Sequence, residues 1–317
     1  MLSAEKIHAS RPCPISGSND AIIVSSKDRH GESLRNVLCE ESGLIYVDPV
    51  PFENTEEFYQ TEYRKSYKGV HEPKSKHVYR AGKIALERMS RISKFLPKSA
   101  ECLDAGSSSG EFVYLLNSKG FKSQGVEANM PYAEYSINEL GIGVKVCPFS
   151  QFQTDTKFDL ISMFHVLEHL ENPVRDLSHL GKFLKSNGKL VIEVPNILYP
   201  DMAFSHKWHP GHLFSFTEHT LMHLVEKAGF RTISCNPIND GGNLWGIFEY
   251  KQESEGNFSP QFSDSNEILK KIYRGKNSYH LRFWNYLKFL PKAVRQISEK
   301  VNSGGLSGKQ ILDKLYS

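Results

Sequence analysis

The sequence predicts an α/β fold in which five strand–helix repeats are followed by an antiparallel hairpin. An apolar strand at 101–105 runs into a loop of small residues and then into a helix that begins near Glu111. Two further strands, at 230–235 and 243–250, flank the turn signal Asp240-Gly241-Gly242. The remaining strands are expected at 121–127, 144–147, 157–164 and 189–194.

Composition limits the class of protein. The chain has 317 residues, of which 39% are hydrophobic, enough for one large α/β domain with appendages. It contains no apolar run near the ~18 residues of a membrane span, and its start lacks the apolar segment of a signal peptide. Five scattered cysteines predict no disulfide framework. We therefore expect a soluble, cytoplasmic protein.

The loop after the first strand of the α/β part is the candidate ligand site. Gly106 and Gly110 permit positive φ angles and close approach of a ligand to the backbone, and the free N–H groups of the following helix face that ligand. The next strand ends in Glu127, whose carboxylate can accept hydrogen bonds from both ribose hydroxyls of a nucleoside. A third glycine at the dinucleotide spacing is missing, which disfavours a nicotinamide-dependent enzyme.

Asp104-x-Gly-x-Ser-x-Gly, with Glu127 after it, resembles the first two motifs of class I S-adenosylmethionine (SAM) dependent methyltransferases, although Ser108 stands where the middle glycine is usual. Over residues 10–252 the resemblance implies a Rossmann-like, seven-stranded sheet with an antiparallel last strand, and SAM as cofactor. It implies these cofactor-binding residues: Asp104, Gly106, Ser107, Ser108, Gly110, Glu111, Phe112, Glu127, Ala128, Phe149, Ser150, Phe164 and His165.

Two C-x-x-S-G units, at Cys13 and Cys39, resemble the four-cysteine zinc ribbon of a methyltransferase branch that acts on sugars and related small molecules. Serine is a poor zinc ligand, so we expect a ribbon that kept its fold and lost its metal. Two unrelated cysteines in an irregular arm are the alternative. The expected domains are a ribbon and tyrosine-rich lid at 1–70, a methyltransferase domain at 71–252 and a basic helical tail at 253–317. In the lid, Tyr63 and Tyr67 are candidate substrate contacts.

The stretch His165-Val-Leu-Glu-His169 resembles the same branch, and His169 either takes part in the chemistry or caps the next helix. The insertion at 198–216 is rich in histidine and aromatics and is expected to overhang the pocket. Within it, His206 and Trp208 are candidate substrate contacts. His212 is the leading general base and His209 the second, and we expect no metal site because no third ligand stands near this pair in the sequence. Sugar C-methylating relatives have an acid just before this histidine, where the chain has Gly211.

These features predict a SAM-dependent methyltransferase whose acceptor is a small molecule, namely a hydroxyl of a nucleotide-linked sugar or glycan in carbohydrate or natural-product biosynthesis. The alternatives are a C- or N-methyltransferase and a SAM-binding pseudoenzyme that serves as a partner subunit. Residues 266–317 carry a net charge of +8 against −5 for the rest. This tail can pack on the core, pair protomers as a homodimer, or contact a membrane surface; nucleic acid is the partner we expect least.

Overall fold

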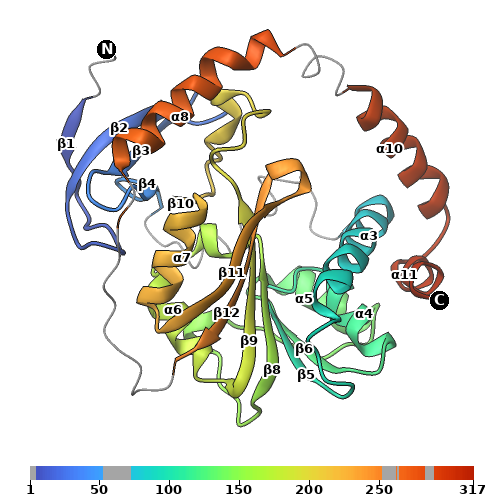
Figure 1. Ribbon diagram of the computed structural model, residues 1–317. Helices are drawn as coiled ribbons and strands as arrows, with labels where there is room; N and C mark the ends of the chain where they lie inside the picture. The colour runs from blue at the N-terminus through green and yellow to red at the C-terminus, as the bar shows by residue number, and fades with distance from the viewer. Residues whose placement is uncertain (1–4, 53–72, 252–261, 263, 283–288) are drawn as a thin grey trace. The chain divides into compact units, whose positions relative to one another are not determined.

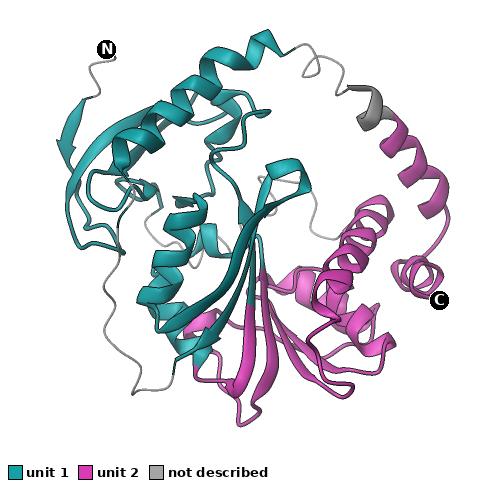
Figure 2. Cartoon of the chain, viewed as in Figure 1, with its two compact units in different colours: residues 1–53, 164–181, 191–286 teal, residues 54–163, 182–190, 287–317 magenta. Residues whose placement is uncertain are grey.

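The computed structural model describes residues 5–52, 73–251, 262, 264–282 and 289–317. The chain forms two compact units, coloured separately in Figure 2. The first unit comprises residues 1–53, 164–181 and 191–286, and the second comprises 54–163, 182–190 and 287–317. Tyr63 and Tyr67, the two candidate residues of the lid, lie outside the described residues.

A seven-stranded sheet follows the order β11-β12-β9-β8-β5-β6-β7 (Figure 1). Strand β5 pairs in parallel with both β6 and β8, β6 pairs in parallel with β7, and β11 pairs antiparallel with β12. The predicted seven-stranded sheet with an antiparallel end is therefore confirmed. Its strands are β5 (Glu101–Ala105), β6 (Lys122–Val126), β7 (Val144–Lys145), β8 (Phe158–Phe164), β9 (Leu184–Pro195), β11 (Phe230–Ile238) and β12 (Asn243–Tyr250).

Helices follow the strands in the predicted alternation. Strand β8 is buried over almost its whole length, as expected of a strand whose sheet is covered on both faces. Helix α7 begins with a capping box in which Thr217 and Thr220 bond each other's backbone N–H, which satisfies two donors at the start of the helix. The helices of this α/β part are α3 (Ser75–Ile92), α4 (Glu111–Ser118), α5 (Met130–Asn138), α6 (Pro173–Gly181) and α7 (Glu218–Lys227).

A second, five-stranded sheet has the order β1-β2-β3-β4-β10 and belongs to the first unit. Strand β10 comes from the histidine-rich insertion and pairs antiparallel with β4, Phe214 opposite Tyr46 and Ser215 opposite Ile45. The N-terminal strands and the insertion thus share one sheet. The strands are β1 (Lys6–His8), β2 (Asp20–Lys27), β3 (Ser33–Cys39), β4 (Ile45–Val47) and β10 (Phe214–Ser215).

The tail divides between the two units. Helix α8 (Ser265–Ser278) packs in the first unit, where Ile268 and Ile272 share a hydrophobic cluster with Trp208. Helices α10 (Phe289–Ser303) and α11 (Gly308–Tyr316) pack in the second unit against α3 and α4. None of the helices within the described ranges is long and apolar enough to cross a membrane.

Two polar contacts fix the end of the chain to the second unit. The Arg80 guanidinium donates two hydrogen bonds of 2.6 Å to the Glu299 carboxylate, and the Tyr316 hydroxyl donates to the Glu111 carbonyl at 3.0 Å. The first contact joins α3 to α10, and the second places the last helix against the start of α4. Packing on the core, one of the three expectations for the tail, therefore describes α11.

Candidate functional site

The loop between β5 and α4 turns through positive φ angles at Gly106 (82°), Ser108 (51°) and Gly110 (82°). Only the glycines adopt this region without strain, so Ser108 holds a conformation that its side chain disfavours. The loop also depends on a glycine in the neighbouring strand, because a Cβ at Gly125 would lie 2.3 Å from Ser107 Oγ. Gly125 was not among the residues that the sequence indicated.

Asp104 and Glu127 hold this loop from either side in the second unit. Asp104 is 4% exposed, and it accepts a hydrogen bond of 2.6 Å from Ser162 Oγ on β8. Burial raises the pKa of Asp104 to about 6. Glu127 Oε2 accepts from the Ser108 N–H and Oε1 from the Asn129 N–H, both at 2.8 Å. Each Glu127 oxygen has capacity for a further hydrogen bond.

The other candidate cofactor residues of the second unit have more varied surroundings. Glu111 is buried and accepts a 2.7 Å hydrogen bond from Ser109 Oγ, so this carboxylate serves its own loop. Phe112 is buried beside it in the first turn of α4. Ala128 is half-buried, as are Phe149 and Ser150 in the short helix η2 (Phe149–Gln151).

In the first unit, His165 follows β8 directly and lies between two buried carboxylates. Its Nδ1 is 3.3 Å from Glu168 Oε1, and its Nε2 is 3.5 Å from Glu193 Oε1. Burial acts to lower its pKa, but the two nearby carboxylates outweigh burial and raise the pKa to about 9. The imidazole is therefore a cation at neutral pH. Its predicted neighbour Phe164 stacks on Trp245, with ring centroids 5.7 Å apart.

Two residues of this network were missed in the sequence. Glu193 lies on β9 and is 3% exposed, and Asn243 Nδ2 donates to its Oε1 at 2.6 Å. A charged residue within the apolar run of β9 was the available signal, because a buried carboxylate requires a partner.

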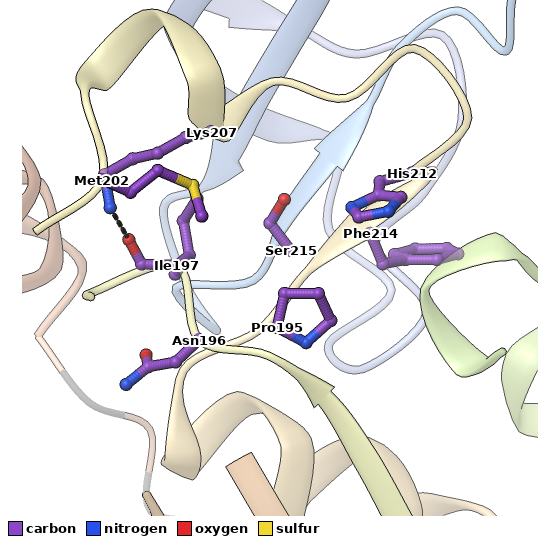
Figure 3. A pocket seen from close by; sticks show the side chains of 8 residues that line it. All are labelled: Pro195, Asn196, Ile197, Met202, Lys207, His212, Phe214 and Ser215. Carbon is purple, nitrogen blue, oxygen red and sulfur yellow. Dashed lines mark hydrogen bonds between the residues drawn. The ribbon is translucent and has the colours of Figure 1, made fainter. Parts of the chain in front are cut away.

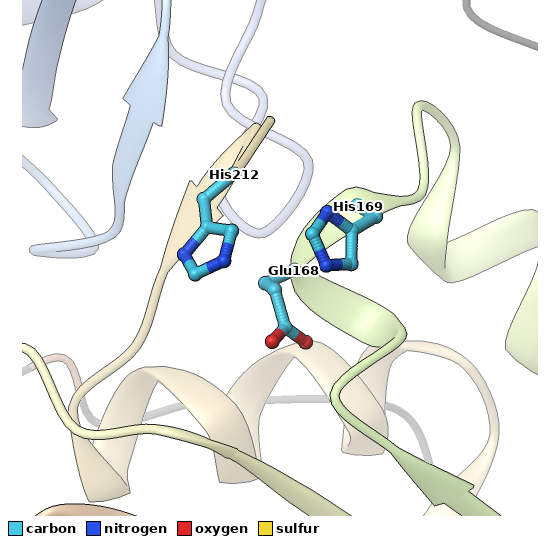
Figure 4. Close-up of side chains that lie close together, drawn as sticks. All are labelled: Glu168, His169 and His212. Atoms are coloured by element: carbon cyan, nitrogen blue, oxygen red, sulfur yellow. The ribbon is translucent and has the colours of Figure 1, made fainter. Parts of the chain in front are cut away.

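Glu168 and His169, on the short helix η3 (Leu167–His169), lie beside His212 from the insertion (Figure 4). We call these three residues the Glu–His cluster. One carboxylate oxygen and one ring nitrogen from each histidine lie within 4.8 Å of one another. The Leu213 N–H donates to the Glu168 carbonyl at 2.8 Å, which fixes the two segments together.

Backbone hydrogen bonds determine which nitrogen carries the proton in two of the histidines. His169 Nδ1 lies 2.7 Å from the Gly211 carbonyl, and because a carbonyl only accepts, this nitrogen is the donor. The Gly211 N–H donates to His209 Nδ1 at 2.9 Å, so neutral His209 carries its proton on Nε2. Gly211, which stands in place of an acid, thus orients two histidines through its backbone.

His209 and His212 are stacked, with ring centroids 4.3 Å apart. Burial, assisted by the positive charge of Arg29, lowers the pKa of His209 to about 3. Burial and the neighbouring His169 and His209 lower the pKa of His212 well below its usual value. Both rings are therefore neutral at pH 7.

His212 also lines a small hollow of the first unit (Figure 3). Lys207, another residue missed in the sequence, lines it too and donates to the carbonyls of Ile197 at 2.7 Å and Tyr199 at 2.6 Å. Burial lowers the pKa of Lys207 to about 8. The full lining is Pro195, Asn196, Ile197, Met202, Lys207, His212, Phe214 and Ser215.

The two candidate substrate contacts of the insertion lie elsewhere. Trp208 is 1% exposed and packs in the hydrophobic cluster with α8, while His206 is exposed on the short helix η4 (Phe204–Lys207). Neither residue is among those that line the hollow.

The sheet order, the turn after β5 and the acid after β6 define an α/β enzyme of the nucleotide-binding type. A family model described as methyltransferase domain matches residues 77–235, half of the chain. The chain belongs to this methyltransferase family, which confirms the predicted enzyme class and, with it, SAM as the methyl donor.

Solved structures show a similar fold. A TehB-like SAM-dependent methyltransferase from Corynebacterium glutamicum is 17% identical, with 54% of this chain and 99% of that chain covered and a TM-score of 0.41. The methyltransferase CcbJ from Streptomyces caelestis is 10% identical, with 62% and 99% covered and a TM-score of 0.47. The glycopeptide N-methyltransferase MtfA in complex with SAM is 12% identical, with 53% and 94% covered and a TM-score of 0.44. A search of curated proteins gave no match.

The residues around the loop fit an adenosyl group. The buried Ser107 hydroxyl finds no hydrogen-bond partner among the residues that the structure describes, and a bound ligand would provide one. Glu127 retains acceptor capacity on both oxygens, as recognition of a ribose diol requires.

Proposed function

We propose that the chain transfers the methyl group of SAM to a hydroxyl of a small-molecule acceptor, a nucleotide-linked sugar or a glycan terminus. The observation that carries this proposal is the Glu–His cluster, in which His212, with a pKa well below its usual value, and His169 lie beside the buried carboxylate of Glu168. A hydroxyl needs assistance to lose its proton during methyl transfer, whereas the sulfonium supplies its own driving force. Unprotonated His212 can accept that proton directly or bind a cation that acidifies the hydroxyl.

Residues of each unit have a proposed role. Asp104 and Glu127 hold the donor, Glu127 through the ribose hydroxyls, and the loop N–H groups face its methionine part. His165, a cation between Glu168 and Glu193, fixes the end of β8 from which the cluster continues. Lys207 is a further candidate for binding an anionic acceptor group, because an ammonium has three donors and two of them serve carbonyls.

Membership of the branch that acts on sugars is part of this proposal. It is supported by the paired Cys-x-x-Ser-Gly units, and by the joining of the ribbon to the insertion through β10.

The test uses SAM with a deuterated methyl group and a panel of nucleotide-linked sugars and glycans. The expected product is heavier by one deuterated methyl group on oxygen, and fragmentation identifies the atom. Donor binding, measured by calorimetry, is expected to fall at least tenfold in Asp104→Ala and in Glu127→Ala. A label found on nitrogen or carbon would contradict the proposed acceptor and favour an N- or C-methyltransferase. SAM binding without turnover on any acceptor would favour a pseudoenzyme.

A further inference from the structure

The Glu–His cluster presents more acceptors than donors. Neither oxygen of Glu168 receives a hydrogen bond from the residues within the described ranges, although its side chain is only 1% exposed. A buried carboxylate with open lone pairs is costly unless a cation or a donor satisfies it. We therefore expect the Glu168 carboxylate to bind a positively charged ligand.

Nearby positive charge does not fill this need. His165 lies 3.3 Å from Glu168 Oε1 but also 3.5 Å from Glu193 Oε1. A single imidazole can carry at most one positive charge, and it is shared between two carboxylates. Oε2 of Glu168 is left without an ionic neighbour among the described side chains, so one negative charge is not offset.

His169 is already arranged as a metal ligand. Its Nδ1 donates to the Gly211 carbonyl at 2.7 Å, so that in the neutral ring the lone pair is on Nε2. Metal-binding histidines almost always donate their second nitrogen to a carbonyl or carboxylate in this way, because the bond fixes the ring orientation. His209 is not so arranged, since its Nδ1 accepts the Gly211 N–H.

We propose that Glu168, His169 and His212 bind one divalent transition-metal cation, with Zn²⁺ the best fit. Two histidines and one carboxylate are a common ligand set for such ions, and three protein ligands leave a position open for a water or a substrate oxygen. Ligands at about 2.1 Å from a tetrahedral ion lie about 3.4 Å apart. The three ligand atoms lie within 4.8 Å of one another, so an ion would close the widest pair by at most about 1.4 Å, which side-chain rotation supplies.

The cation would act on the acceptor in the proposed reaction. An alcohol oxygen bound to the open position loses its proton more readily than a free one, because the metal stabilises the alkoxide. This use of the ion rests on the proposed function, whereas binding of the ion does not.

The test measures binding on the full chain after removal of metals by a chelator. We expect one equivalent of Zn²⁺ by calorimetry. With Co²⁺ as the probe we expect visible absorption bands without a thiolate-to-cobalt charge-transfer band, because the ligands are nitrogen and oxygen. Glu168→Gln and His212→Ala are each expected to weaken binding at least tenfold, since each removes one of three ligands.

Two controls separate this site from other sites. The double variant Cys13→Ser/Cys39→Ser removes the thiols of the N-terminal ribbon and should bind Zn²⁺ as tightly as the parent chain. His8→Gln removes an exposed histidine that pairs with Asp20 and should also leave the affinity unchanged. SAM binding by every variant serves as the check of folding, and Glu168→Asp replaces Glu168→Gln if the latter fails that check.

Three results would overturn the inference: no stoichiometric Zn²⁺ or Co²⁺ binding by the parent chain, equal affinity in Glu168→Gln, or a thiolate band that disappears with Cys13 and Cys39. Metal binding without methylation of any hydroxyl would instead defeat the proposed function and leave the site intact. Full methylation by the chelator-treated chain would leave the proposed function intact and remove the metal from it.

Discussion

Two polar clusters of the first unit, the Glu–His cluster and a cluster near the N-terminus, differ in whether their own hydrogen bonds satisfy them. In the ribbon, Cys13, Ser16, Cys39 and Ser42 converge, and we call them the knuckle cluster. Cys13 Sγ lies 3.1 Å from Ser42 Oγ, and Ser16 Oγ lies 3.3 Å from Cys39 Sγ. The hydrogen bond between the two thiols raises the pKa of Cys13 and lowers that of Cys39.

The knuckle cluster satisfies itself because thiols and hydroxyls both donate and accept. In the Glu–His cluster, the Glu168 carboxylate can only accept, and neither of its oxygens receives a hydrogen bond from the described residues. A cluster of two thiols and two hydroxyls is thus closed by its own hydrogen bonds, whereas a cluster built on a carboxylate is not. The predictions below test this contrast.

The largest effect is expected from restoring the four thiols of the knuckle cluster. Ser16→Cys/Ser42→Cys would place four thiolates where the side chains already converge, the ligand set of a structural zinc site. With zinc at 1,000 times its Kd, the free energy of unfolding should rise by about 4 kcal/mol. Thermal unfolding with and without a chelator measures this. An unchanged Tm would mean that the four positions do not form a tetrahedron.

The second largest effect is expected in the pH dependence of the free energy of unfolding, to which Lys207 contributes. Lys207 lines the same hollow as His212. Burial lowers its pKa from 10.5 to about 8, so between these values the unfolded chain holds a proton that the folded chain does not. The free energy of unfolding should therefore rise with pH over this range, by about 3 kcal/mol relative to Lys207→Met. Denaturant unfolding of both chains at pH 7.5 and 10.5 measures the difference. Parallel pH profiles would show that Lys207 is not desolvated.

The substitution His212→Ala tests the Glu–His cluster. Methyl transfer should fall about 100-fold, because His212 assists removal of the hydroxyl proton as base or as ligand. Cys13→Ser, at a buried position of the knuckle cluster, should leave the rate within about twofold. Single-turnover kinetics at saturating SAM compares them. Full turnover by His212→Ala would exclude it from the chemistry.

The smallest effect is expected from Ser42→Ala in the knuckle cluster. The change removes the hydroxyl bonded to Cys13 Sγ and to the Leu44 N–H, at a cost of about 1 kcal/mol. Denaturant unfolding at neutral pH measures it, with Ser18→Ala, which removes an exposed hydroxyl, as the control. A loss as small as that of Ser18→Ala would show that the cluster is not held by these bonds.

Much of the α/β fold was predictable because its signals are local. The loop from Asp104 to Gly110 requires small residues at fixed positions, and the hairpin of β11 and β12 requires its turn. The seven-stranded sheet and the methyltransferase class followed from them. The roles of the individual site residues stay predictions.

The candidate site could be predicted only in part, because its signals are not local. Glu168 and His212 lie far apart in the sequence, and Gly211 contributes through its backbone, which no residue pattern records. Glu193 and Lys207 can be recognised as site residues only because the folded chain buries them.

By itself, the sequence determined the order of strands and helices, the turn from Asp104 to Gly110 and the enzyme class, because backbone conformation and periodicity depend on neighbouring residues. The tertiary structure alone decided the pairing of β10 with β4, the division of the tail between two units and the meeting of Glu168 with two histidines. Such contacts join distant segments, and their geometry is set by packing and hydrogen bonding in the folded chain.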